Sequence, residues 1–159
     1  MKKLAKLLLC GLLSVTMLAG CSNNADEPTT VGGIMHKEFT EIVEGKTAFE
    51  IAEALSTSET LPFMGGAIEI EEGFLSGFDN YEVKGFKSGA MFAPMMGTIP
   101  FVGYIFELEE GADVEAFKTS LKENANLRWN ICTEAEEMTI ENEGNFVFFL
   151  MSPTEFEAE

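Results

Sequence analysis

Apolar residues recur every three or four positions in two segments of the chain, which is the spacing of a helix with one buried face. The first segment covers residues 48–56 and opens with a Thr47–Glu50 pair whose spacing is typical of a capping box. The second follows Asp113, a good N-cap residue, and covers residues 114–131. We therefore predict two helices in these ranges.

Alternating and continuous apolar runs predict strands elsewhere in the chain. Residues 67–71 and 81–84 alternate, whereas residues 99–108 are apolar on both faces, as expected for a central strand. Residues 138–140 and 146–151 flank an Asn-Glu-Gly-Asn turn and predict a closing hairpin. Because short antiparallel connections dominate, we expect an α+β fold: an antiparallel sheet of about five strands with the two helices packed on one face.

The first twenty residues have the pattern of an export signal. Three lysines precede an apolar run over residues 7–18, which is too short to span a bilayer as a helix. The run ends in Leu18-Ala19-Gly20-Cys21, which resembles the lipobox of bacterial lipoproteins. The resemblance implies that a signal peptide, residues 1–20, is removed and that lipid, including palmitate, is attached at Cys21. It places the protein at the cell membrane, lipid-anchored and facing the outside; the alternatives are a soluble secreted protein or a retained anchor helix.

Residues 22–33 carry almost no apolar side chains, so burial could not offset the entropy lost on ordering them. We predict a flexible tether that, with the lipidated cysteine, covers residues 21–45 and spans about 25–30 Å. Residues 34–45 are ambiguous, since their apolar side chains could dock as a short strand or a helical turn: Phe39, Ile42 and Val43. A single folded domain is expected at residues 46–153, followed by an acidic tail over residues 154–159.

The chain is strongly acidic, with 27 Asp and Glu residues against 10 Lys and Arg. Three of the ten basic residues fall in the predicted signal peptide, which leaves a mature net charge of 7 − 27 = −20. Such a surface excludes nucleic acid as a partner, because phosphate binding needs clustered Lys and Arg. It would also be repelled by anionic lipid headgroups. The charge is typical of a soluble acidic surface, and the alternative is a surface that attracts cations, metal ions or basic proteins.

The residue types needed for common catalytic sites are lacking in the sequence or poorly placed. The one histidine, His36, falls in the predicted tether, so a Ser-His-Asp site is disfavoured. Cys132 is the only cysteine left for the folded domain and is expected as a small buried apolar residue. Zinc ligand sets and glycine-rich phosphate loops are also lacking in the sequence. We therefore predict no catalytic residue, no metal site, no cofactor and no enzymatic activity.

Methionines crowd into one short region, residues 91–100, which should be a loop or a bent strand. If this region is exposed, it is the expected contact surface for a partner, through Met91, Phe92, Met95 and Met96. The alternatives are ordinary core packing and, together with Met64, thioether ligands for Cu(I). A group of carboxylates could bind Ca²⁺ but lacks the usual ligand spacing, so a solvated turn is favoured there: Glu107, Glu109, Glu110 and Asp113.

These observations favour a non-enzymatic binding or accessory domain of the cell envelope. Its expected partners are the membrane, through the lipid on Cys21, and an envelope protein or a small ligand. The alternatives are a metal- or cation-binding or sensing domain and an undetected carboxylate-dependent hydrolase. Paired catalytic carboxylates have no sequence signature, because what defines them is their separation in space.

The layout of the chain resembles a family of small uncharacterised lipoproteins found mainly in Gram-positive bacteria. Its members share a lipobox, a short helix, an apolar strand, a helix led by an acidic residue, and a final strand that opens with Gly-Asn and an aromatic residue. The matching segments here are residues 46–55, 92–108, 113–121 and 144–150. The resemblance implies a fold and a location, and it lends no catalytic residue.

Overall fold

The computed structural model describes residues 27–156, so the predicted signal peptide and Cys21 lie outside the described part. Within this range, three helices and seven strands follow one another in the order α1 (Val31–Ile42), α2 (Ala48–Ser56), β1 (Gly65–Ile70), β2 (Gly73–Phe74), β3 (Glu82–Val83), β4 (Ser88–Pro94), β5 (Val102–Glu107), α3 (Val114–Asn124), β6 (Glu137–Glu143) and β7 (Phe146–Ser152). Among the described residues, no helix is both long enough and apolar enough to cross a membrane.

Five strands form one antiparallel sheet in the order β1-β4-β5-β7-β6, and β2 pairs with β3 in a small separate sheet. The predicted α+β fold with a five-stranded antiparallel sheet is therefore confirmed. The run that was predicted as a central strand is β5, which pairs with β4 on one side and β7 on the other. Its side chains are buried on both faces of the sheet, Tyr104 on one and Ile105 on the other.

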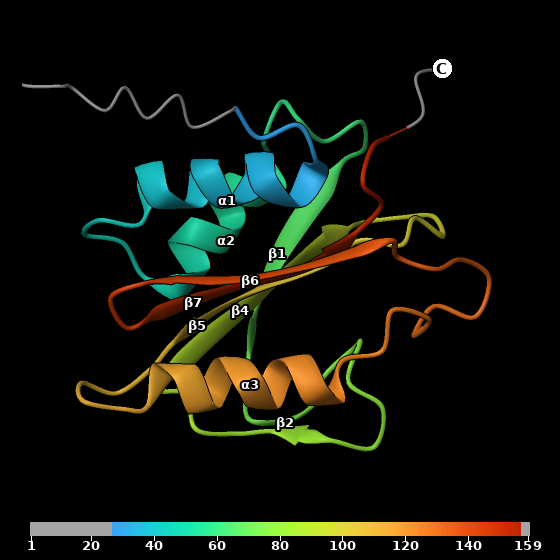
Figure 1. Ribbon diagram of the computed structural model, residues 1–159. Helices are drawn as coiled ribbons and strands as arrows, with labels where there is room; N and C mark the ends of the chain where they lie inside the picture. Colours follow the sequence, from blue (N-terminus) through green and yellow to red (C-terminus); the bar gives the residue numbers. More distant parts are fainter. Residues whose placement is uncertain (1–26, 157–159) are drawn as a thin grey trace, which may run out of the picture.

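Both faces of the sheet are covered, so the molecule has three layers (Figure 1). Helices α1 and α2 pack on one face, and α3 packs on the other, beside the β2–β3 segment. One face thus carries two helices, as expected, but α1 takes the place that was predicted for α3. Strands β5 and β7 carry apolar side chains on both faces of the sheet, such as Phe148 and Phe149 of β7. Because both faces must be shielded from water, helices pack on each of them.

Helix α1 lies inside the range predicted as a flexible tether, residues 21–45, and is part of the core. Thr30 caps it by accepting a hydrogen bond from Gly33 N, and Met35 and Phe39 are fully buried against the sheet. The Phe39 ring lies 5.4 Å from that of Phe148. The tether prediction was therefore too long, and the folded domain begins near Thr30. Local propensity failed here because packing against the sheet, rather than intrinsic preference, stabilises this glycine-containing helix.

The first turn of α1 is held close to the edge strand β6. Gly32 N donates to a Glu137 carboxylate oxygen at 2.6 Å, and Val31 N donates to the carbonyl of Thr154 at 2.9 Å. A Cβ at Gly32 would overlap the Thr139 hydroxyl, so glycine permits the close approach of helix and strand. The chain therefore enters the domain where β7 ends and β6 begins.

Two further boundaries differ from the predictions. Helix α3 ends at Asn124, earlier than the predicted residue 131, because the chain turns away to bond with the loop before β3: Asn126 N donates to the Gly77 carbonyl at 2.8 Å. The tail predicted at residues 154–159 is anchored in its described part. Thr154 donates to Glu136 through its backbone N–H and its hydroxyl, and the Phe156 ring packs 5.7 Å from the Phe63 ring.

Candidate functional site

Exposed methionines gather at the end of the sheet where β1 begins and β4 ends. Met64, Met95 and Met96 have exposed fractions of 75%, 64% and 82%. The Met95 N–H donates to the Met64 carbonyl at 3.0 Å, which continues the β1–β4 pairing one residue beyond the strands. Strand pairing therefore places Met64 and Met95 next to each other although they are far apart in the sequence.

The loop between α3 and β6 lies beside the methionine loop and carries a fourth exposed apolar side chain. Ile131 is 99% exposed, and its loop is fixed to the methionine loop by two hydrogen bonds to the Thr98 carbonyl. The Asn130 amide donates at 3.4 Å and the Thr133 hydroxyl at 2.7 Å. We call these four side chains the apolar rim: Met64, Met95, Met96 and Ile131.

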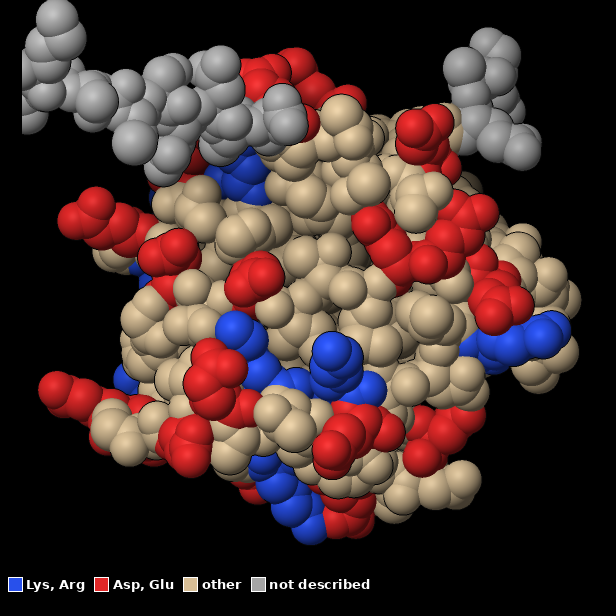
Figure 2. Space-filling view, viewed as in Figure 1, with Lys and Arg blue, Asp and Glu red and all other residues tan. Residues whose placement is uncertain are grey.

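The apolar rim is built from segments without charge in an otherwise acidic chain. No Asp, Glu, Lys or Arg occurs in residues 61–68, 88–106 or 129–133. Elsewhere, acidic side chains spread over much of the surface that Figure 2 shows, with several basic side chains over α3. Exposed apolar side chains on uncharged segments are typical of a contact surface.

The four residues named as a contact surface, on the condition that they are exposed, do not lie together. Met95 and Met96 are exposed, but Phe92 is fully buried between the rings of Phe101 and Phe148, at 5.8 and 6.4 Å. Met91 is half-buried on the opposite face of the sheet, in the core under α3. Successive residues of a strand point to opposite faces, so Met91 and Phe92 could not share one surface once they lay in β4.

Met64 and Ile131 were not predicted as contact residues, and no local signal marks them. Met64 was considered only as a thioether ligand, and Ile131 fell in the predicted helix. Both reach the apolar rim through contacts between distant segments. The absence of charge in the three segments was visible in the sequence, but the same pattern also describes buried strands.

The carboxylates considered for Ca²⁺ are not brought into one site. Glu107 accepts from the Lys87 ammonium at 2.7 Å and the Ser88 hydroxyl at 2.8 Å, and these two bonds hold its pKa below the usual range of a glutamate. Asp113 caps α3 by accepting from Ala116 N at 3.0 Å. Over residues 27–156, no three Asp, Glu, His or Cys side chains are grouped so that they could hold a metal ion.

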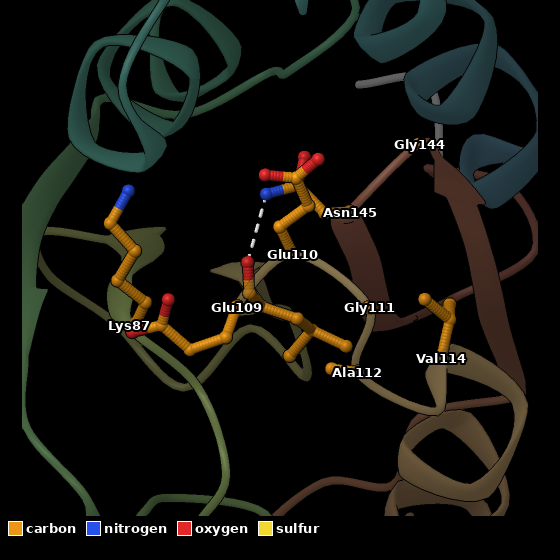
Figure 3. A pocket seen from close by; sticks show the side chains of 9 residues that line it. Lys87, Glu109, Glu110, Gly111, Ala112, Val114, Gly144 and Asn145 are labelled. Atoms are coloured by element: carbon orange, nitrogen blue, oxygen red, sulfur yellow. Dashed lines mark hydrogen bonds between the residues drawn. The ribbon is translucent and has the colours of Figure 1, made fainter.

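A polar hollow of about 640 Å³ lies beside these carboxylates, at the opposite end of β5 from the apolar rim. Its lining residues include Lys87 just before β4, Glu109 and Glu110 in the loop after β5, and Asn145 in the β6–β7 turn (Figure 3). Two of its polar groups already have partners: the Asn145 amide donates to the Leu108 carbonyl at 2.8 Å, and the Lys87 ammonium pairs with the Glu107 carboxylate. The hollow thus lies between three segments of the chain, and the bonds of Lys87 and Asn145 hold these segments together.

Two residues with potential chemistry lie elsewhere than predicted. His36 lies on α1, not in a tether, and its ring is 6.2 Å from that of Phe39 and 5.9 Å from that of Phe148. Cys132 is exposed, so the prediction of a buried apolar residue was wrong. It follows Ile131 in the loop between α3 and β6, beyond the early end of α3.

Comparison with known proteins adds no relative for this fold or this site. No family model matches the chain, and neither a curated protein nor a solved structure matches it. The resemblance to small Gram-positive lipoproteins therefore stays a prediction.

Methionine oxidation should separate the apolar rim from the core. In dilute peroxide, we expect Met64, Met95 and Met96 to oxidise rapidly in the folded protein, because oxidation follows exposure of the thioether. Met35 and Met151 are fully buried and serve as internal controls that should resist until the protein unfolds. Peptide mass spectrometry over a time course measures each rate. Slow oxidation of all three rim methionines would show that the rim is covered in solution.

Proposed function

We propose that the protein is a membrane-anchored extracytoplasmic lipoprotein whose folded domain is a non-enzymatic binding or accessory domain of the cell envelope, with the apolar rim as its contact surface. The observation that carries this proposal is the rim itself. Its four large apolar side chains are between 64% and 99% exposed, and they belong to three uncharged segments of a chain whose predicted mature charge is −20. Exposing them to water costs free energy that a partner would recover.

The location rests on the sequence before the folded domain. The basic start, the short apolar run and Leu18-Ala19-Gly20-Cys21 together support export and lipid attachment at Cys21. Nine residues, 22–30, separate Cys21 from Val31, the first residue of α1. A lipid at Cys21 would therefore keep the domain at the membrane surface.

Binding is favoured over catalysis by the way the reactive side chains are used. Glu107 is held by Lys87 and Ser88, Asp113 caps a helix, and His36 packs against two phenylalanine rings. Each of these groups stabilises an element of the fold. An acid–base pair for catalysis would instead need groups that converge on an open substrate site.

The lipid anchor is tested by Cys21→Ala. This variant should lose incorporation of radiolabelled palmitate and accumulate as an unprocessed precursor, because the acceptor thiol is missing. Cys132→Ala is the matched control, since it removes the exposed thiol of the folded domain and should leave labelling and processing unchanged. Gel autoradiography and the intact mass report both outcomes.

Two results would contradict the proposal. Palmitate uptake by Cys21→Ala would show that the lipid is attached elsewhere. Reproducible turnover by the protein in a panel of hydrolase substrates, abolished by replacing one acidic residue, would show that the domain is an enzyme.

A further inference from the structure

The apolar rim lies at the end of the sheet where the chain enters the domain. Val31 N bonds to the Thr154 carbonyl just past the end of β7. The antiparallel register pairs Met151 with Val102 at the start of β5, and Pro94 at the end of β4 with Gly65 at the start of β1. The start of α1 and the rim therefore share one end of the sheet (Figure 1). Phe74, another exposed large apolar residue, lies in β2, beyond the opposite end of β1.

The chain between the proposed lipid anchor and the domain is short. Residues 22–30 are nine in number, and even a fully extended chain of that length spans no more than about 32 Å. Lipid at Cys21 thus holds the start of α1, and with it the rim end of the sheet, near the bilayer.

We infer that the apolar rim is a membrane-docking surface, which settles on an electroneutral phospholipid surface such as phosphatidylcholine. The inference rests on the proposed lipid anchor and names the partner of the proposed contact surface. Methionine and isoleucine side chains can enter the boundary between headgroups and acyl chains, and no charge in the three rim segments would have to be desolvated. A tether supplies the high local concentration that so small an apolar surface needs.

Charge favours neutral lipid over anionic lipid. A hollow of about 530 Å³ adjoins the rim through Thr98 and Thr133, and it is lined by three carboxylates: Glu134, Glu136 and Glu155. These side chains and the mature charge of −20 would be repelled by an anionic surface at the close distance that docking requires. Docking should therefore weaken as anionic lipid replaces phosphatidylcholine.

The test uses the lipidated full-length protein in phosphatidylcholine vesicles. A fluorophore is attached through Met96→Cys in a Cys132→Ser background, with Phe74→Cys in the same background as the control at the far end of the domain. A quencher carried on the lipid should reduce emission from position 96 about threefold more than from position 74. Replacing half of the phosphatidylcholine by phosphatidylglycerol should diminish that difference.

Tether length provides a second measurement that leaves the folded domain untouched. Inserting twenty Gly and Ser residues after Ala25 lengthens the tether from nine to twenty-nine residues. The local concentration of the rim at the membrane should then fall about sixfold, and quenching at position 96 should fall with it.

Three outcomes separate failure of the inference from failure of the proposed function. Equal quenching at positions 96 and 74 in the lipidated protein would overturn membrane docking and leave the anchor intact. Shielding of position 96 in native membranes but not in phosphatidylcholine vesicles would also overturn it, in favour of a protein partner. A purified protein whose mass shows no lipid at Cys21 would overturn the proposed function itself.

Discussion

A chain that begins at Lys46 should fail to unfold cooperatively, because it lacks α1. The deletion removes Val31, Met35 and Phe39 from the core and uncovers Phe148 of β7. Truncating a single buried methionine or phenylalanine to alanine costs about 2–5 kcal/mol, and a domain of this size has only about 5–15 kcal/mol of stability in total. We therefore expect a broad, non-cooperative transition in thermal denaturation followed by near-ultraviolet circular dichroism.

The matched control is a chain that begins at Glu27. It keeps the Thr30 cap and the hydrogen bonds that join the first turn of α1 to Glu137 and Thr154, so it should melt in one sharp transition. A cooperative melt for the chain that begins at Lys46, with native-like aromatic signals, would show that α1 is dispensable.

Phe92→Ala should lower the free energy of unfolding by about 3–5 kcal/mol, as expected for removing a fully buried phenylalanine. The ring fills the space above Gly103, where a Cβ would overlap it, and packs against Phe101 and Phe148. Its loss would leave a cavity between α2 and the centre of the sheet, since the neighbouring strand offers no side chain at Gly103 to fill it. Urea denaturation measures the change.

Phe74→Ala provides the same chemical change at an exposed position and should alter the unfolding free energy by no more than about 0.5 kcal/mol. Comparable small effects for both variants would mean that Phe92 is a surface residue, which was the condition for its place in the predicted contact surface. A large effect for Phe92→Ala alone assigns it to the core and leaves Met95 and Met96 as the exposed part of that prediction.

The sequence by itself determined the elements that depend on neighbouring residues. The Thr47–Glu50 capping box forms as predicted, with the Thr47 hydroxyl accepting from Glu50 N and the carboxylate accepting from Thr47 N. Asp113 caps α3, and the Asn-Glu-Gly-Asn turn joins β6 to β7. These signals are local. A cap or a turn needs only groups within about four residues of one another, so it can be predicted from the sequence alone.

Only the tertiary structure decided how the elements share the sheet. Helix α1 has glycine at its second and third positions and is stabilised by β6 and β7, more than ninety residues away, so propensity alone could not reveal it. Its presence leaves α3 to cover the second face of the sheet. The predicted helix 114–131 stops at Asn124 because the chain bonds to the distant Gly77 carbonyl.

The candidate site, too, was decided by the tertiary structure. Successive side chains of β4 point to opposite faces of the sheet, so Met91 and Phe92 lie on different faces. Met95 and Met96 follow the end of that strand and are exposed to solvent. Met64 joins them by strand pairing, and Ile131 joins them through two hydrogen bonds to Thr98. A surface made by three separate segments has no period or motif along the chain. Its position is set by burial and hydrogen bonding between residues that are distant in sequence, because apolar attraction has no direction of its own.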